Sequence, residues 1–169
     1  PGSGMCPSVL FDGSRLHLVY GRKGLAYYTS SSDGGRTFAP SVQLGGGKYA
    51  GDVGHERGPW VALGKDGSLH VVWMNGPEAK VFYTRSTDGG RSFSEPRNLA
   101  PRSNGVDGAT LAADASGEVY VVWANTGQGP ESPVSKTLMF VFSSDNGSTF
   151  SVPRALDNTY PGGACACCS

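Results

Sequence analysis

Short hydrophobic runs alternate with turns rich in Gly, Asp and Ser along most of the chain. The first unit begins with "CPSVLFDGSRLHLVYG" (6–21), in which the turn "DGS" joins an apolar run to a strand that alternates apolar and polar residues. Asp and Gly supply the positive φ that a tight hairpin turn requires. Two more short apolar runs follow, "LAYYTS" (25–30) and "PSVQL" (40–44). The pattern therefore predicts a four-stranded antiparallel meander.

The same order of elements recurs twice. Hairpins are predicted in "GPWVALGKDGSLHVVWMN" (58–75) and "GATLAADASGEVYVVWAN" (108–125), and each precedes a third and a fourth short strand. Every third strand leads into one octapeptide, which reads "SSDGGRTF", "STDGGRSF" and "SSDNGSTF" in turn. Its aspartates stand at 33, 88 and 145, so the repeats are 55 and 57 residues long. Periods of this size indicate a propeller or a solenoid.

The chain is therefore predicted to be all-β, a single β-propeller segment that spans 1–169. Its four-stranded blades are expected at about 5–45, 58–99 and 108–156, and "GGACACCS" (162–169) resembles the start of a fourth. Propellers usually close with about four to eight blades, so three blades would leave exposed sheet edges. Either the chain is part of a longer protein, or two copies complete a six-bladed ring.

Composition narrows the classes of partner. Fourteen Lys and Arg balance fourteen Asp and Glu among 169 residues, so no one-signed field favours binding to nucleic acid or to a membrane surface. No segment approaches the roughly 20 apolar residues that a membrane span needs. The first residues, "PGSGMCPSV", lack the regions of a signal peptide but do not look like a natural start either, so export is left open.

The octapeptides fit the pattern Ser/Thr-x-Asp-x-Gly-x-Thr/Ser-Phe/Trp in all three copies. This is the Asp-box of the bacterial neuraminidase repeat, and nearly the whole chain resembles the sialidase-like β-propellers. The resemblance implies a propeller fold and a structural role for the boxes. It also implies a secreted or periplasmic protein that acts on or binds glycans. Asp-boxes also occur in propellers that are not sialidases, so the resemblance is more specific for fold than for activity.

Physical reasoning also favours a structural role for the Asp-box. A carboxylate there can accept hydrogen bonds from N–H groups of its own turn, the glycine permits a change in the sign of φ, and the phenylalanine can return to the core. These residues are Asp33, Gly35 and Phe38, Asp88, Gly90 and Phe93, and Asp145, Gly147 and Phe150. His17 and His70 occupy one matching strand position, and Tyr20, Trp73 and Trp123 occupy another; both sets are expected to be packing residues.

Connections in a meander alternate between the two faces of a propeller, so a ligand site is expected on the face opposite the Asp-boxes. The segment "YAGDVGHERGP" leads into the second blade on that face and contains Asp52, His55, Glu56 and Arg57. Arg57 could clamp a carboxylate, Glu56 or Asp52 could serve as acid or base, and His55 could bind ligand. Asp107, at the equivalent place one blade on, is a further ligand-binding candidate. The alternative is a solvated, self-paired charged loop.

The resemblance implies a specific site for a sialidase: three arginines on the substrate carboxylate, a tyrosine nucleophile with a glutamate partner, and an aspartate acid/base. Only Arg57 has a plausible place in such a cluster, and no Arg-Ile-Pro sequence is present. We therefore carry two hypotheses. The first is a sialidase-type glycoside hydrolase or a relative that binds a glycan or small acidic ligand. The second is a non-catalytic module that binds a ligand or a soft metal.

The metal hypothesis rests on four cysteines, Cys6, Cys165, Cys167 and Cys168. Three thiols within four residues suit Cu(I) or Zn, and repeat alignment places Cys6 at a comparable position. A disulfide or free thiols are the alternatives. No other cofactor is expected.

Overall fold

The fold is built from twelve strands in a computed structural model that describes residues 4–54, 57–126 and 137–156. They form three four-stranded antiparallel sheets in which strand order follows chain order. Blade 1 contains β1 (Met5–Phe11), β2 (Leu16–Arg22), β3 (Leu25–Ser31) and β4 (Val42–Gln43). Blade 2 contains β5 (Trp60–Leu63), β6 (Leu69–Asn75), β7 (Lys80–Ser86) and β8 (Arg97–Asn98). Blade 3 contains β9 (Val106–Ala113), β10 (Val119–Asn125), β11 (Thr137–Ser143) and β12 (Arg154–Ala155). The prediction of propeller blades is confirmed.

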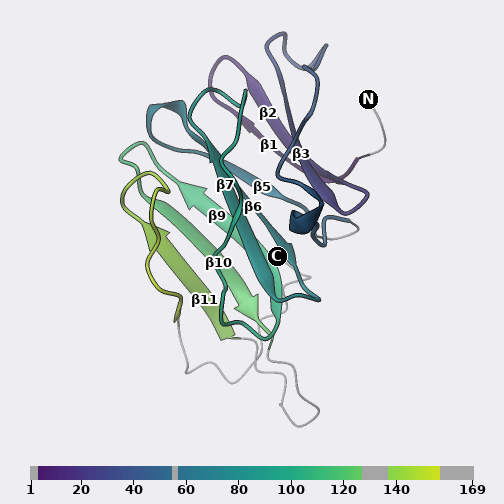
Figure 1. Cartoon of the computed structure of the whole chain (residues 1–169). Helices are drawn as coiled ribbons and strands as arrows, with labels where there is room; N and C mark the ends of the chain where they lie inside the picture. Colours follow the sequence, from purple (N-terminus) through teal and green to yellow (C-terminus); the bar gives the residue numbers. More distant parts are fainter. Residues whose placement is uncertain (1–3, 55–56, 127–136, 157–169) are drawn as a thin grey trace.

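The three blades lie side by side, with blade 2 between the other two (Figure 1). The first strand of blade 2, β5, contacts both β1 and β9, so the first strands of the three blades line the inner side of the segment. Two short 3₁₀ turns complete the described elements, η1 (Gly47–Tyr49) between blades 1 and 2 and η2 (Lys65–Gly67) in the first turn of blade 2. The fourth blade expected at 162–169 lies outside the described residues.

The core consists of two hydrophobic clusters, one on each face of blade 2. Val71 and Trp73 face blade 1, where they pack with Val19 and Tyr28. Val72, the residue between them, faces the opposite way and joins the cluster shared with blade 3. Because successive side chains of a strand point to opposite faces, β6 is apolar on both.

The outer faces of blades 1 and 3 have no such cover among the described residues. Phe38 is 45% exposed, which corrects the expectation that every Asp-box phenylalanine returns to the core. Tyr20, expected to be a core aromatic, is only half-buried on the same face. Its counterparts Trp73 and Trp123 are fully buried, because each is covered by a neighbouring blade.

Candidate functional site

Each of the three Asp-box turns has the same pattern of hydrogen bonds. In blade 2, Asp88 Oδ1 accepts from the Ser92 N–H at 3.0 Å and from the Ser86 hydroxyl at 2.7 Å. Asp88 Oδ2 accepts from the Ser92 hydroxyl, and the Gly90 N–H donates to Ser86 Oγ at 2.9 Å. Matching bonds surround Asp33 and Asp145. The carboxylate closes its own turn, as its residues lead one to expect.

These hydrogen bonds keep the Asp-box carboxylates ionised. Bonds from the Thr37 side chain and backbone, with one from Ser31, lower the pKa of Asp33 to about 2. Equivalent bonds hold the pKa of Asp88 and of Asp145 well below the usual value. A carboxylate saturated by its own turn and ionised at neutral pH is unsuited to proton transfer. The geometry therefore favours the structural interpretation of the boxes.

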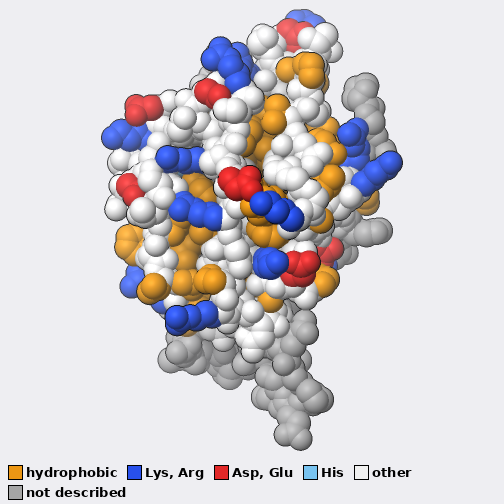
Figure 2. All heavy atoms as spheres, viewed as in Figure 1, with side chains coloured by type: hydrophobic (Ala, Val, Ile, Leu, Met, Phe, Trp, Pro, Cys, Tyr) orange, Lys and Arg blue, Asp and Glu red, His pale blue; other side chains and the backbone are white. Residues whose placement is uncertain are grey.

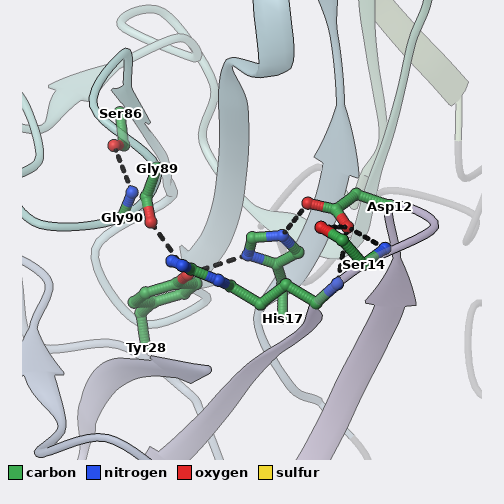
Figure 3. A network of polar contacts seen from close by, with 8 residues as sticks. Asp12, Ser14, His17, Tyr28, Ser86, Gly89 and Gly90 are labelled. Atoms are coloured by element: carbon green, nitrogen blue, oxygen red, sulfur yellow. Dashed lines mark hydrogen bonds and ion pairs between the residues drawn. The ribbon is translucent and has the colours of Figure 1, made fainter. Parts of the chain in front are cut away.

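Histidine and tyrosine side chains join the Asp-box turns of blades 2 and 3 to the preceding blade. In Figure 3, His17 contacts the Asp12 carboxylate through Nε2 at 3.0 Å and the Tyr28 hydroxyl through Nδ1 at 2.8 Å. The Tyr28 hydroxyl also reaches the Gly89 carbonyl in the Asp-box of blade 2. The sequence indicated His17 as a packing residue but did not reveal its polar partners, which come from a turn and a neighbouring strand.

Blade 2 repeats the arrangement toward blade 3. His70 Nδ1 contacts the Tyr83 hydroxyl at 2.7 Å, and its Nε2 contacts the Asn146 side-chain oxygen at 3.2 Å. Burial lowers the pKa of His70 to about 4 and raises the pKa of Tyr83. Both groups are therefore uncharged at neutral pH. They connect two blades inside the protein, where no ligand can reach them.

The blade-to-blade connections on the opposite face bring Arg57 and Asp107 together. Arg57 Nε donates to Asp107 Oδ1 at 2.6 Å, so the guanidinium of one connection pairs with the carboxylate at the start of β9. The two positions are equivalent in their blades, since Ala62 and Ala112, each five residues further on, pair with the equivalent residues His70 and Tyr120. The ion pair thus joins equivalent positions of two neighbouring blades.

Burial of this pair is uneven. The Asp107 side chain is 11% exposed and the Arg57 side chain 39%. A largely buried carboxylate requires a charged partner, and a hydrogen bond between charged groups is among the stronger ones. The remaining exposure of Arg57 leaves a cation accessible from solvent on the face away from the Asp-boxes.

Asp52 belongs to the same blade-to-blade connection as Arg57. Its N–H donates to the Met74 carbonyl at 2.7 Å, which fixes the backbone against the end of β6. Its carboxylate and the Val106 carbonyl would each lie 3.5 Å from a Cβ placed on Gly76. Asp52 is exposed, and Gly76 thus lies close both to its carboxylate and to the carbonyl of Val106, the residue before Asp107. His55 and Glu56, the other candidates from this segment, lie outside the described residues.

A hollow, whose lining includes Gly58, the residue after Arg57, lies between the inner strands β1 and β5. It has a volume of about 460 Å³. Its lining consists of Cys6, Pro7, Ser8, Val9, Gly58, Pro59 and Trp60. Trp60 is 48% exposed, an unusual position for a large aromatic side chain. Sequence reasoning missed Trp60, although a signal was present: by strand pairing, the equivalent positions in the other blades hold the small residues Ser8 and Thr110.

The structure describes one of the four cysteines on which the metal hypothesis rests. Cys6 lies in an irregularity of the β1–β2 pairing, where its φ is +46°, and its carbonyl packs closely on Gly58. Cys165, Cys167 and Cys168 fall outside the described residues. Within 4–54, 57–126 and 137–156, no group of three or more His, Cys, Asp or Glu side chains is arranged to hold a metal ion. In the same ranges, no helix has the length and apolarity needed to span a membrane.

Comparisons with known proteins identify the fold. No protein-family model and no curated protein sequence matches the chain. Among solved structures, an ulvan lyase of polysaccharide lyase family PL25 aligns with 91% of this chain and 39% of its own, at 15% identity and a TM-score of 0.63. Hadza microbial sialidase Hz136 aligns with 90% of this chain and 38% of its own, at 18% identity and a TM-score of 0.59.

A third structure, the Penicillium chrysogenum α-L-arabinanase complexed with arabinobiose, aligns with 94% of this chain and 50% of its own, at 15% identity and a TM-score of 0.60. The chain therefore spans about two fifths of the lyase and the sialidase and half of the arabinanase. At these identities the likeness establishes the propeller-type fold.

Proposed function

We propose that this propeller segment binds glycans that carry a carboxylate, at a site formed by Arg57, Asp107 and Trp60. The observation that carries the proposal is the Arg57–Asp107 ion pair, which stands on the face away from the Asp-box turns, with Arg57 three residues before the exposed Trp60. Arginine recognises carboxylates through a planar array of N–H donors. An exposed indole ring offers an apolar surface against which the carbon face of a sugar ring can pack.

The similar structures support the chemical class. Those named above are a sialidase, an ulvan lyase and an arabinanase with a bound disaccharide, so each acts on or holds a glycan. A second ulvan lyase structure contains GlcA(1-4)Rha3S, whose glucuronate unit bears a carboxylate. An acidic sugar would meet Arg57 as a ligand that competes with Asp107 for the guanidinium.

A finer form of the proposal is sialidase-type hydrolysis. Arg57 would hold the sialic acid carboxylate, and Asp52 or Glu56 would transfer the proton to the leaving oxygen. The resemblance implies two more arginines, a tyrosine and its glutamate partner, so further blades would supply them. Release of fluorophore from a fluorogenic sialoside tests this step separately from binding.

Binding is tested by titrating the full chain with sialyllactose and with lactose, which differ in one acidic residue. We expect a preference for sialyllactose that Arg57→Lys reduces about tenfold, because lysine keeps the charge but loses the planar fork. Trp60→Ala should weaken both ligands. Arg91→Lys, at an exposed arginine on the Asp-box face, is the matched control and should change nothing. Equal affinity for the two sugars, or equal effects of the two arginine variants, would refute the proposal.

A further inference from the structure

The outer faces of blades 1 and 3 are apolar surfaces that no described segment covers. On blade 1 a hollow of about 890 Å³ is lined by Leu18, Tyr20, Arg22, Phe38 and Pro40, among others. On blade 3, Tyr120, Leu138 and Phe142 are each 37 to 40% exposed. Figure 2 shows hydrophobic side chains gathered over the β11 side of the molecule, beside basic ones. Contiguous exposed apolar area of this kind marks an interaction surface.

The covered blade shows what these faces are built to contact. Strand pairing makes Val71, Trp73 and Phe82 of blade 2 equivalent to Leu18, Tyr20 and Tyr27 of blade 1. All three blade 2 residues are at most 3% exposed, because blade 1 packs on them. The outer face of blade 1 therefore has the residues of a blade-to-blade contact without the neighbour.

The same holds for the outer face of blade 3. Val72, Val81 and Tyr83, which blade 3 covers, are each at most 1% exposed. Their equivalents by strand pairing are Val122, Leu138 and Phe140. Leu138 is exposed, and Val122 and Phe140 are half-buried. Blade 2 packs against blade 1 with one face and against blade 3 with the other. The outer faces of blades 1 and 3 each have the residues for one side of such a contact.

Blade 3 also contains the arginine that receives an Asp-box turn. In blade 2, the Arg97 guanidinium lies 4.8 Å above the Phe150 ring and donates to the Ser148 and Gly147 carbonyls of the next Asp-box. Arg154 pairs with Phe140 as Arg97 pairs with Tyr83, and its guanidinium lies 4.4 Å above the Phe140 ring. The cation is already stacked where the carbonyls of an incoming turn would accept its hydrogen bonds.

Blade 1 presents the complementary turn. The Phe93 and Phe150 rings of the other Asp-boxes pack on Tyr28 and Tyr83, with centroids 5.1 and 4.8 Å apart. Phe38 has no such partner in the described part of the chain. The turn that blade 1 exposes is thus of the type that Arg154 and Phe140 are arranged to receive.

We propose that a second copy of this chain covers both faces. Blade 1 of each copy would pack on blade 3 of the other, with Phe38 on Phe140 and with Arg154 donating to the Asp-box carbonyls. The contact is head-to-tail, and two such contacts related by a two-fold axis close a ring. Two sets of three blades make six, within the range that closed propellers use. The net charge of zero sets no general repulsion against the pairing.

The test is the solution mass of the full chain by sedimentation, at concentrations up to about 100 μM, where a contact of ordinary size is populated. The expected mass is twice the 17.6 kDa of one chain. Phe38→Asp and Arg154→Glu lie on opposite halves of the contact, and each should give a folded monomer by circular dichroism. Arg91→Glu, in an Asp-box whose blade is covered on both faces, is the matched control and should remain a dimer.

A wild-type monomer over this range would overturn the proposal and indicate that other blades cover the faces. Dissociation by only one of the two variants would also overturn it, because a contact between two like faces needs only one of them. The sugar titration above does not depend on this result, so either proposal can fail alone.

Discussion

Blade 2 and its two neighbours are built from one strand pattern but bury it differently. Six consecutive residues of β6, Leu69 to Met74, are buried. In β2 of blade 1, burial alternates with half-exposure from residue to residue. The half-exposed positions of β2 include Leu18 and Tyr20, which are apolar like their β6 equivalents. What differs is the cover, since β6 has a sheet on both faces and β2 on one.

The Asp-box turns give the same lesson at smaller scale. All three have matching hydrogen bonds, because those bonds depend only on residues within each turn. Their surroundings differ. The turns of Gly90 and Gly147 are pressed against Tyr28 and Tyr83, while the nearest atom to a Cβ on Gly35 would be Leu16 Cδ1 at 3.4 Å. The hydrogen-bonded turn is a local property, and its packing depends on the neighbouring blade.

The largest expected effect separates Gly147 from Gly35. Both have positive φ, +76° and +87°, so alanine costs about 1 kcal/mol of conformational strain at either site. At Gly147 the added Cβ would also collide with the buried Tyr83 hydroxyl, which is held by His70. Gly147→Ala should therefore lose at least about 3 kcal/mol of unfolding free energy or fail to fold.

Urea denaturation of the two alanine variants in dilute solution measures this difference. Gly90→Ala, which meets Tyr28 in the same way, should behave like Gly147→Ala. If all three variants lost equal stability, the blade-to-blade packing of these turns would not matter, and the contrast between covered and open boxes would be wrong.

The second prediction concerns the pH dependence of stability that His70 contributes to the contact between blades 2 and 3. Burial lowers the His70 pKa from 6.5 to about 4 in the folded protein. Between these values the unfolded chain binds more protons than the folded one, so stability falls as pH falls from about 6.5 to 4. The shift corresponds to a loss of roughly 3 kcal/mol across that window. Loss from Asp33, whose folded pKa is about 2, comes at lower pH.

Unfolding free energies of wild type and His70→Gln between pH 7.5 and 4.5 check this expectation. The variant is less stable at neutral pH, where it loses the contacts with Tyr83 and Asn146, but its stability should vary less with pH. A slope unchanged in His70→Gln would exclude His70 as its source.

The blades could be predicted from sequence because their signals are local and repeated. Alternation of apolar residues, Asp and Gly in the turns, and the Asp-box each act within a few residues. The fate of Phe38 could not be predicted in this way, because its sequence environment matches that of Phe93 and Phe150 while its spatial environment does not. A repeat shows what each copy can contact, and only the arrangement of blades shows which copies do.

The candidate site was partly predictable for the same reason. Arg57 and Asp107 stand at equivalent positions in successive blades, so repeat alignment made both of them candidates on one face, but it did not predict the ion pair between them. Trp60 was missed because an aromatic residue in a strand normally indicates core. Trp60 lies on an inner strand and lines the hollow between β1 and β5, which leaves its indole ring partly exposed.

The smallest effect concerns the Asp-box aspartates themselves. Asp33→Ala and Asp88→Ala remove the same hydrogen bonds from Ser31 and Thr37 or from Ser86 and Ser92, and both should lower the melting temperature. The decrease should be greater for Asp88→Ala, because its turn also positions Gly90 against blade 1. Neither change touches the opposite face, so the affinity of the folded variants for sialyllactose should match that of the wild type. Loss of affinity with the melting temperature intact would instead place these aspartates in a binding site, and the two faces of the propeller would exchange roles.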